Sequence, residues 1–430
     1  MRKFIAIVGL LILAALLAVS CSDRGTNVPD APKEDVIESW AINPLANHVF
    51  TQNPDDPTGS PQLLFQVKNR DHIQEMTMYV PRAAYPPPTG ELKPVPLLIL
   101  LAPQFGSKYF YFDHGLLQIA QELLAEGKIQ PMIICCLSSD QVFGGYFYGN
   151  SYPAGYYDDI IAAPDDQGLV AFLNGQYSNL INSASKRGIG GIGLGAYGAY
   201  RAILKHPGMF SSISVADGPL DFDGADGSSG LMSLFDVALQ EQGLTPATFP
   251  TNFDSSTAWP VSSMFIGGGL AFSPHDTLLT YDLRIIGIGS QTKDTTDILS
   301  RWTLEDSASL ISNIIKEDQG SWEFHVPFDG SGNVNSDIWA LWMRNNLDSL
   351  LAGAGAGVLN GVNQWIGTSP NARFGFHEMT MSWVSTLEGD GYTPEVYQYN
   401  GYEGNPAQGS EYVYDLIREM LIFHSQNFGD

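Results

Sequence analysis

Residues 191–195, which read Gly-Ile-Gly-Leu-Gly, have the spacing of a nucleophile elbow but hold no nucleophile. In such an elbow, small residues flank a serine, so that a sharp turn between a strand and a helix can expose its hydroxyl. The central position here is Gly193, which has no side-chain atom that could form a covalent intermediate. Glycine adopts the strained backbone of this turn without a Cβ clash. The sequence therefore predicts that the turn is kept and its chemistry is lost.

Other acidic and histidine residues could bind a ligand, but each has a structural alternative. His275 and Asp276 could line a ligand cleft, although a loop histidine that caps a turn is the favoured interpretation. The carboxylate pairs Asp158–Asp159 and Asp165–Asp166 have oxygen donors that suit Ca²⁺. Their places near predicted helix starts favour a helix-dipole role instead. We predict no metal site and no cofactor.

Five tyrosines lie close together between residues 146 and 157, namely Tyr146, Tyr148, Tyr152, Tyr156 and Tyr157. This cluster could stack against sugars or pack as an ordinary loop, and both interpretations stay open.

Two cysteines, Cys135 and Cys136, are adjacent in the apolar run 131–139, which is predicted as a buried strand. Successive strand residues point to opposite faces, so we expect two buried free thiols.

The amino-terminal residues resemble a bacterial lipoprotein signal with its lipobox. A short basic start and an apolar run end in Ala-Val-Ser before Cys21. This pattern predicts a signal peptide over 1–21, a lipid on Cys21, and a flexible tether over 22–36. The chain would then be anchored to membrane lipid in the bacterial envelope, facing the periplasm or the exterior. The alternative is an ordinary cleaved signal peptide with an incidental cysteine.

The composition argues against a nucleic-acid partner. The chain of 430 residues carries 46 acidic and 21 basic residues, a net charge of −25. Binding to nucleic acid needs a basic surface that neutralises phosphates. The length is enough for one large domain or two ordinary ones, and 44% hydrophobic residues can form a substantial core.

Buried strands alternate with amphipathic helices along the chain. Strands are predicted at 72–81, 95–103, 131–139 and 188–192, and helices at 115–127, 165–177 and 196–205. This alternation predicts an α/β fold with a doubly wound, mostly parallel sheet. The predicted domain spans 37–430, and a cap-like insertion at about 224–348 interrupts the alternation. The stretch 335–351 at the end of this insertion also has a helical pattern.

Several stretches resemble the esterase family that includes esterase D, feruloyl esterases and mycolyltransferases. They are "VPLLILLAPQFGS" (95–107), "GYYDDIIAAPDDQGLVAFLNGQY" (155–177) and "GIGLGAYGAYRAILKHPGMFSSISVADGPLD" (191–221). The resemblance implies an α/β-hydrolase fold with an inserted cap. It also implies a serine at the position of Gly193, an oxyanion amide at Leu194, and a His-Gly loop where this chain reads Ala-Pro-Gln-Phe-Gly (102–106). Gln104 and Phe105 of this loop are candidates to line a ligand cleft.

The residues that should complete a catalytic triad are absent from the matching segments. The loop 365–376 contains no carboxylate, and no histidine occurs between His377 and His424. The sequence therefore predicts an esterase-like surface lipoprotein without catalysis, whose cleft binds a glycan or an acyl ester. An active ester hydrolase or acyltransferase that uses residues such as His275 and Asp276 stays open. So does a structural role in the envelope.

Overall fold

The computed structural model describes most of the chain after residue 35. The described residues are 36–43, 49–52, 74–84, 94–139, 147–151, 155–157, 161, 169–176, 186–224, 230–249, 252–253, 259–273, 325–401 and 410–429. Cys21, His275 and Asp276 lie outside them, as do both predicted carboxylate pairs. The signal segment 1–21, the lipid partner, the tether and the domain boundaries therefore stay predictions.

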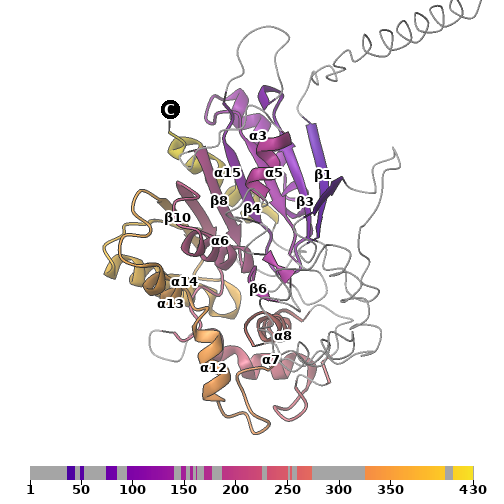
Figure 1. The fold of residues 1–430 in the computed structure, drawn as a ribbon, viewed down its shortest axis with the longest axis vertical. Helices are drawn as coiled ribbons and strands as arrows, with labels where there is room; N and C mark the ends of the chain where they lie inside the picture. Colours follow the sequence, from indigo (N-terminus) through magenta and orange to yellow (C-terminus); the bar gives the residue numbers. More distant parts are fainter. Residues whose placement is uncertain are drawn as a thin grey trace, which may run out of the picture.

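One mixed sheet forms the centre of the molecule (Figure 1). Its nine strands have the order β11-β10-β9-β8-β4-β5-β3-β1-β2. The strands are β1 (Val36–Asn43), β2 (Val49–Gln52), β3 (Gln74–Val80), β4 (Leu97–Leu101), β5 (Ile133–Leu137), β8 (Arg187–Ile192), β9 (Ser212–Ala216), β10 (Asn363–Thr368) and β11 (Glu395–Gln398). Strands from β5 to β11 pair in parallel, whereas β3, β1 and β2 pair antiparallel. The short strands β6 (Asn150–Ser151) and β7 (Gly155–Tyr156) form a separate hairpin.

Helices cover both faces of this sheet because its central strands are apolar on both sides. In β4, Leu97, Ile99 and Leu101 belong to one buried cluster, and Leu98 and Leu100 belong to the other. Helices α3 (Leu116–Ala125) and α15 (Ser410–Asn427) pack on one face. Helices α5 (Leu169–Gln176), α6 (Leu194–Lys205), α13 (Leu347–Ala354) and α14 (Phe376–Gly389) pack on the other. The predicted doubly wound, mostly parallel α/β fold is confirmed.

The glycines of β8 let neighbouring elements approach the sheet closely. A Cβ on Gly188 would lie 2.4 Å from Nδ1 of His424 in α15. On the opposite face, a Cβ on Gly191 would lie 2.4 Å from the backbone of Gly195 in α6. Helices α15 and α6 are therefore seated against opposite faces of β8 because the strand has no side chains at these positions.

Between β9 and β10 the chain forms helices that lie beyond the end of the sheet (Figure 1). They include α7 (Phe235–Gln242), α8 (Pro260–Phe272) and α12 (Ser336–Met343). Every residue of α8 after Pro260 is buried. A Cβ on Gly268 would lie 2.4 Å from the indole ring of Trp342, so the glycine-rich sequence of α8 serves close packing. The cap-like insertion boundaries stay a prediction, since much of this region is not described.

One stretch that the sequence predicts as a single helix forms two helices in the structure. The stretch 335–351 reads as one helix in sequence, but the structure divides it into α12 and α13. Asn346 caps α13, because its side chain accepts a hydrogen bond from the backbone N–H of Leu347 at 3.0 Å. The same carboxamide oxygen accepts from the N–H of Phe222, 3.1 Å away, which ties the helix start to the chain after β9.

None of the described helices is both long and apolar enough to cross a bilayer.

Candidate functional site

Gly193 forms a sharp turn between β8 and α6, at the carboxyl edge of the parallel strands. Its φ of 60° and ψ of −122° are unfavourable for residues with a Cβ. The N–H of Gly193 donates to the carbonyl of Ala216 at 2.9 Å, so the turn is fastened to the end of β9. The predicted elbow geometry is confirmed, and no side chain extends from its apex.

The first turn of α6 is packed tightly onto the end of β4. A Cβ on Gly195 would lie only 2.2 Å from the carbonyl oxygen of Leu101. Leu194, the predicted oxyanion amide, is the first residue of α6 and is buried. Amides in the first helical turn have no intrahelical acceptor. An oxyanion role for Leu194 stays a prediction.

The loop after β4, where the resemblance implies a His-Gly sequence, is hydrogen-bonded to the cap. The carboxamide nitrogen of Gln104 donates to the carbonyl of Pro260, the first residue of α8, at 2.8 Å. Phe105 has a φ of 59°, a left-handed conformation that is uncommon for a residue with a side chain. Both side chains are half-buried. The predicted role of Gln104 and Phe105 in a ligand cleft stays a prediction.

Asp217 is a buried acid beside the elbow that the sequence analysis did not single out. It follows Ala216 at the end of β9 and is 0% exposed. One carboxylate oxygen accepts from the hydroxyl of Thr368 at 2.8 Å, and the other accepts from the hydroxyl of Tyr399 at 2.5 Å. The backbone N–H of Ser369 donates to both oxygens, at 3.3 and 3.2 Å. Burial raises the pKa of Asp217, and the donors from Tyr399 and Thr368 oppose that rise.

These bonds join the carboxyl ends of neighbouring strands. Thr368 is the last residue of β10, and Tyr399 directly follows β11. The resemblance implies that the catalytic acid and histidine lie in the segments after these strands. In this chain, Asp217 from β9 occupies the space between them and binds a threonine and a tyrosine. The signal in the sequence that could have drawn attention to Asp217 is its place directly after a buried strand, at the edge of the sheet where the elbow lies.

His377 approaches this cluster but does not contact the carboxylate of Asp217 through a described hydrogen bond. Its Nδ1 lies 2.9 Å from the hydroxyl oxygen of Thr368. Because that hydroxyl donates its proton to Asp217, the imidazole N–H must be the donor to Thr368. His377 therefore does not act as a base toward the Thr368 hydroxyl in this arrangement.

His424 is committed to a different contact, inside the face covered by α15. Its Nδ1 lies 2.7 Å from the hydroxyl of Ser212, and its Nε2 lies 2.8 Å from that of Ser214. The imidazole is 0% exposed, and burial lowers its pKa to about 3. Because both ring nitrogens of this neutral imidazole are hydrogen-bonded to serines and the ring is buried, His424 serves to pack α15 against the sheet.

Two further polar groups near the cap and the elbow, Ser273 and Tyr148, are engaged in hydrogen bonds within the protein. Ser273 donates to the backbone carbonyl of His325, and the indole N–H of Trp342 donates to the Ser273 hydroxyl at 3.0 Å. The Ser273 hydroxyl is thus engaged with a backbone carbonyl and an indole. In the tyrosine cluster, Tyr148 is buried and donates to the carbonyl of Ala102 at 2.8 Å, and Tyr157 is buried too.

The two adjacent cysteines of β5 are buried, one on each face of the sheet. Cys135 and Cys136 are buried free thiols, as predicted, and burial raises the pKa of both. Among the described residues, no group of three or more His, Cys, Asp or Glu side chains is arranged to hold a metal ion.

Comparisons with known proteins give similar folds and no close relative. No family profile matches the chain, and no curated protein matches it. Solved structures similar to it include a ferulic acid esterase, with 12% identity, a TM-score of 0.46, and coverage of 92% of this chain and 99% of that one. An S-formylglutathione hydrolase from Agrobacterium tumefaciens has 14% identity and a TM-score of 0.43, with coverage of 83% and 91%. The Staphylococcus aureus serine hydrolase FphF has 12% identity and a TM-score of 0.44, with coverage of 92% and 100%. The chain itself has a doubly wound, mostly parallel α/β fold with a sharp glycine turn between β8 and α6.

Proposed function

We propose that this chain is a non-catalytic member of the esterase-like α/β-hydrolases, anchored to a membrane through Cys21. The observation that carries the proposal is Gly193, which keeps the elbow backbone without a nucleophile. At the ends of β10 and β11, where the resemblance implies the acid and the histidine, Thr368 and Tyr399 instead donate hydrogen bonds to the carboxylate of Asp217. These hydrogen bonds stabilise the carboxyl edge of the sheet and leave no hydroxyl–histidine–acid arrangement among the residues that form them.

The packing between the cap and the elbow helix supports the same proposal. Tyr197 of α6 stacks on Phe222 with ring centroids 5.4 Å apart, and Phe222 lies 5.7 Å from Phe272 of α8. Phe272 in turn lies 5.6 Å from Trp342 of α12. These rings join the described cap helices to α6 in one aromatic cluster. We propose that these contacts fix the cap on the sheet and that a cleft at the elbow edge, beside Gln104 and Phe105, binds a glycan or an acyl ester.

Hydrolysis of short p-nitrophenyl esters by the full chain in detergent tests the absence of catalysis. We expect the rate to equal that of buffer alone. The Gly193→Ser variant should also stay at background, because removing triad members costs on the order of 10⁶ in kcat and the histidine partner is still missing. Hydrolysis above background by the unchanged protein would contradict the proposal and favour an active site that uses other residues, with His275 and Asp276 as the first to replace.

Membrane fractionation tests the anchor. Lipid chains on Cys21 would hold the protein stably at the bilayer without a basic patch. The Cys21→Ala variant should appear in the soluble fraction, whereas the unchanged chain should sediment with membranes. Sedimentation of both forms would contradict a lipid anchor at Cys21.

A further inference from the structure

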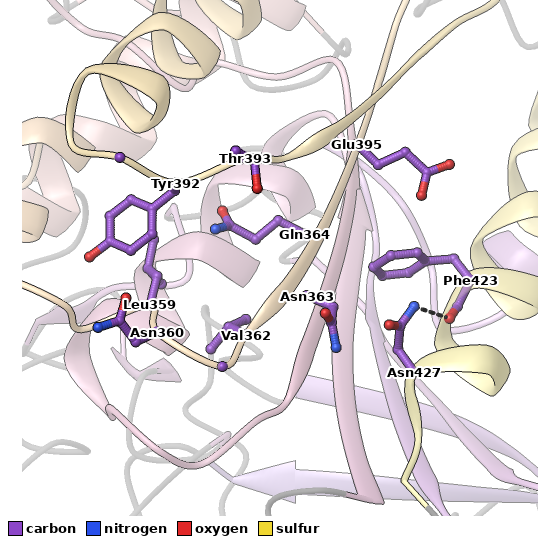
Figure 2. A pocket seen from close by; sticks show the side chains of 12 residues that line it. Leu359, Asn360, Val362, Asn363, Gln364, Tyr392, Thr393, Glu395, Phe423 and Asn427 are labelled. Atoms are coloured by element: carbon purple, nitrogen blue, oxygen red, sulfur yellow. Dashed lines mark hydrogen bonds between the residues drawn. The ribbon is translucent and has the colours of Figure 1, made fainter.

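A polar cavity lies at the edge of the sheet opposite the elbow. It has a volume of about 380 Å³ and is bordered by the starts of β10 and β11, the turn before β10, and the end of α15 (Figure 2). Asn363 and Gln364, the first residues of β10, line it. Thr368, at the other end of the same strand, binds Asp217. At ~3.3 Å per residue, the length of β10 separates the two places by about 17 Å.

Gln364 is the most informative residue of this cavity. Its side chain is only 7% exposed. Its carboxamide oxygen accepts from the hydroxyl of Tyr200 at 3.0 Å. That bond fixes the orientation of the amide, and its nitrogen has no hydrogen-bond partner among the described residues. Figure 2 shows the amide reaching toward Tyr392. A nearly buried N–H₂ group without a protein acceptor is suited to an acceptor on a ligand.

Further amide and hydroxyl groups surround Gln364. Asn360, Asn363 and Thr393 line the cavity, and each of these side chains is exposed. The amide nitrogen of Asn427 donates to the carbonyl of Phe423 at 2.8 Å, which leaves its carbonyl oxygen as an acceptor (Figure 2). Side-chain amides offer a donor and an acceptor in one plane, which matches pairs of adjacent hydroxyl groups.

The charge of the lining excludes one large class of ligand. None of the lining residues is a lysine, arginine or histidine, and the single charged side chain is the carboxylate of Glu395. Phosphates, sulfates and carboxylates are ordinarily held by cationic groups. The cavity is therefore suited to a neutral ligand, for which Glu395 is a hydrogen-bond acceptor.

Two aromatic rings complete the lining. Tyr392 is half-buried and stands on one side of the cavity, and Phe423 lies on the other side of Gln364 (Figure 2). Aromatic rings supply flat apolar surface at a small entropic cost. The C–H face of a sugar ring packs on such a surface while its hydroxyls reach amides and carboxylates. Pockets for small ligands have volumes of about 300–1,000 Å³, so this cavity is near the lower end, with room for one sugar ring.

We propose that this cavity binds a neutral carbohydrate, with Gln364 and Asn360 as hydrogen-bonding groups and Tyr392 as the stacking surface. The proposal does not depend on the function suggested for the elbow, since the two places lie at opposite edges of the sheet. The proposed sugar site lies at the edge of the sheet away from the cap.

Isothermal titration with neutral disaccharides at millimolar concentrations tests this site. The probes are cellobiose, maltose, lactose and chitobiose, with adenosine and inorganic phosphate as non-sugar ligands. We expect at least one disaccharide to bind the unchanged protein. Tyr392→Ala and Asn360→Ala should each weaken it by about tenfold, equivalent to about 1.4 kcal/mol. Asn252→Ala, which replaces an exposed asparagine outside the cavity, should bind as the unchanged protein does.

Three results would overturn the proposal. The first is the absence of disaccharide binding by the unchanged protein, and the second is binding of adenosine or phosphate alone. The third is disaccharide binding that Tyr392→Ala leaves intact and Gln104→Ala abolishes, which would assign the sugar to the elbow edge. Melting temperatures of the variants close to that of the unchanged protein would show that they are folded, since Asn360 is exposed and Tyr392 is only half-buried.

Discussion

The two ends of β10 differ in how their polar groups are satisfied. At the carboxyl end, Thr368, Asp217 and Tyr399 bond to one another in a buried cluster. At the amino end, Asn363 and Gln364 face a cavity, and the amide nitrogen of Gln364 has no bond to a described residue. In parallel α/β sheets, ligands ordinarily bind at the carboxyl end. In this chain that end is internally satisfied, and the amino end keeps unmet hydrogen-bonding capacity.

This difference separates two uses of polar residues. Buried polar groups that bond to each other stabilise the packing of three strand ends, but they have no capacity left for a ligand. Polar groups that meet only water can exchange that water for a ligand at small cost. Changes to Asp217, Thr368 or Tyr399 should therefore affect mainly stability, and changes to the cavity residues at the amino edge should affect mainly binding.

The largest expected effect comes from removing the acid at the elbow edge. Asp217→Ala would leave the hydroxyls of Thr368 and Tyr399 and the amide of Ser369 without their shared acceptor. Each buried group left unsatisfied costs about 1–3 kcal/mol, so we expect a loss of about 3–5 kcal/mol in the free energy of unfolding. Urea denaturation followed by circular dichroism measures it.

The control for this change is an acid that lies on the surface. Asp236 is exposed in the first turn of α7, and Asp236→Ala should change the free energy of unfolding by less than about 1 kcal/mol. Equal losses in the two variants would contradict the stabilising role assigned to Asp217.

A smaller loss is expected from adding one methyl group beside the elbow. In Gly195→Ala, the new Cβ would meet the carbonyl oxygen of Leu101, which belongs to the backbone and cannot rotate away. Overpacking of this kind costs about 1–3 kcal/mol. The melting temperature should fall accordingly, and an unchanged melting temperature would show that α6 can move away from β4.

The fold was predictable from sequence where a local pattern determines the structure. The buried run at 95–103 and the glycine-rich 188–192 both form the expected strands, and the elbow falls at Gly193. The helix α8 was not predicted, because three consecutive glycines conceal a helix that tertiary packing against Trp342 stabilises.

The candidate site was less predictable, since it depends on contacts between distant segments. The absence of a nucleophile at Gly193 is visible in sequence, but the bond from Tyr399 to Asp217 joins residues far apart in the chain. Likewise, Gln364 reads as an ordinary strand residue, and only the fold places it beside Tyr392 in a cavity. His275 and Asp276 lie outside the described residues, so their predicted role stays a prediction.

The dependence of stability on pH tests which buried groups are neutral. Burial lowers the pKa of His424 from 6.5 to about 3 in the folded protein, so below pH 6.5 the unfolded chain binds a proton that the folded chain excludes. Stability should fall by about 1.4 kcal/mol for each pH unit below this point, until the folded pKa is reached. Asp217 has the opposite effect on the pH dependence of stability. Because burial raises its pKa in the folded protein above 3.8, its contribution to the free energy of unfolding falls as pH rises above that value.

Urea denaturation in steps from about pH 7 to about pH 4.5 measures this dependence. The His424→Gln variant removes the imidazole and should show a shallower decrease over the same range. An identical decrease in the variant would mean that other groups cause it, and would leave His424 without a role in acid sensitivity.

The smallest expected effect, and the only gain, lies near the amino edge of the sheet. Gly389 is the last residue of α14, and a Cβ built there would meet no atom within 4 Å. Its φ is not in the left-handed region, so alanine can adopt the same backbone conformation and restricts the unfolded chain. Gly389→Ala should therefore stabilise the protein by about 0.4–1 kcal/mol, measured as a small rise in melting temperature. Gly195→Ala makes the same chemical change in the helix at the elbow edge and should have the opposite sign. If both substitutions were destabilising, or both neutral, the contrast between a tightly packed elbow edge and an open amino edge would not hold.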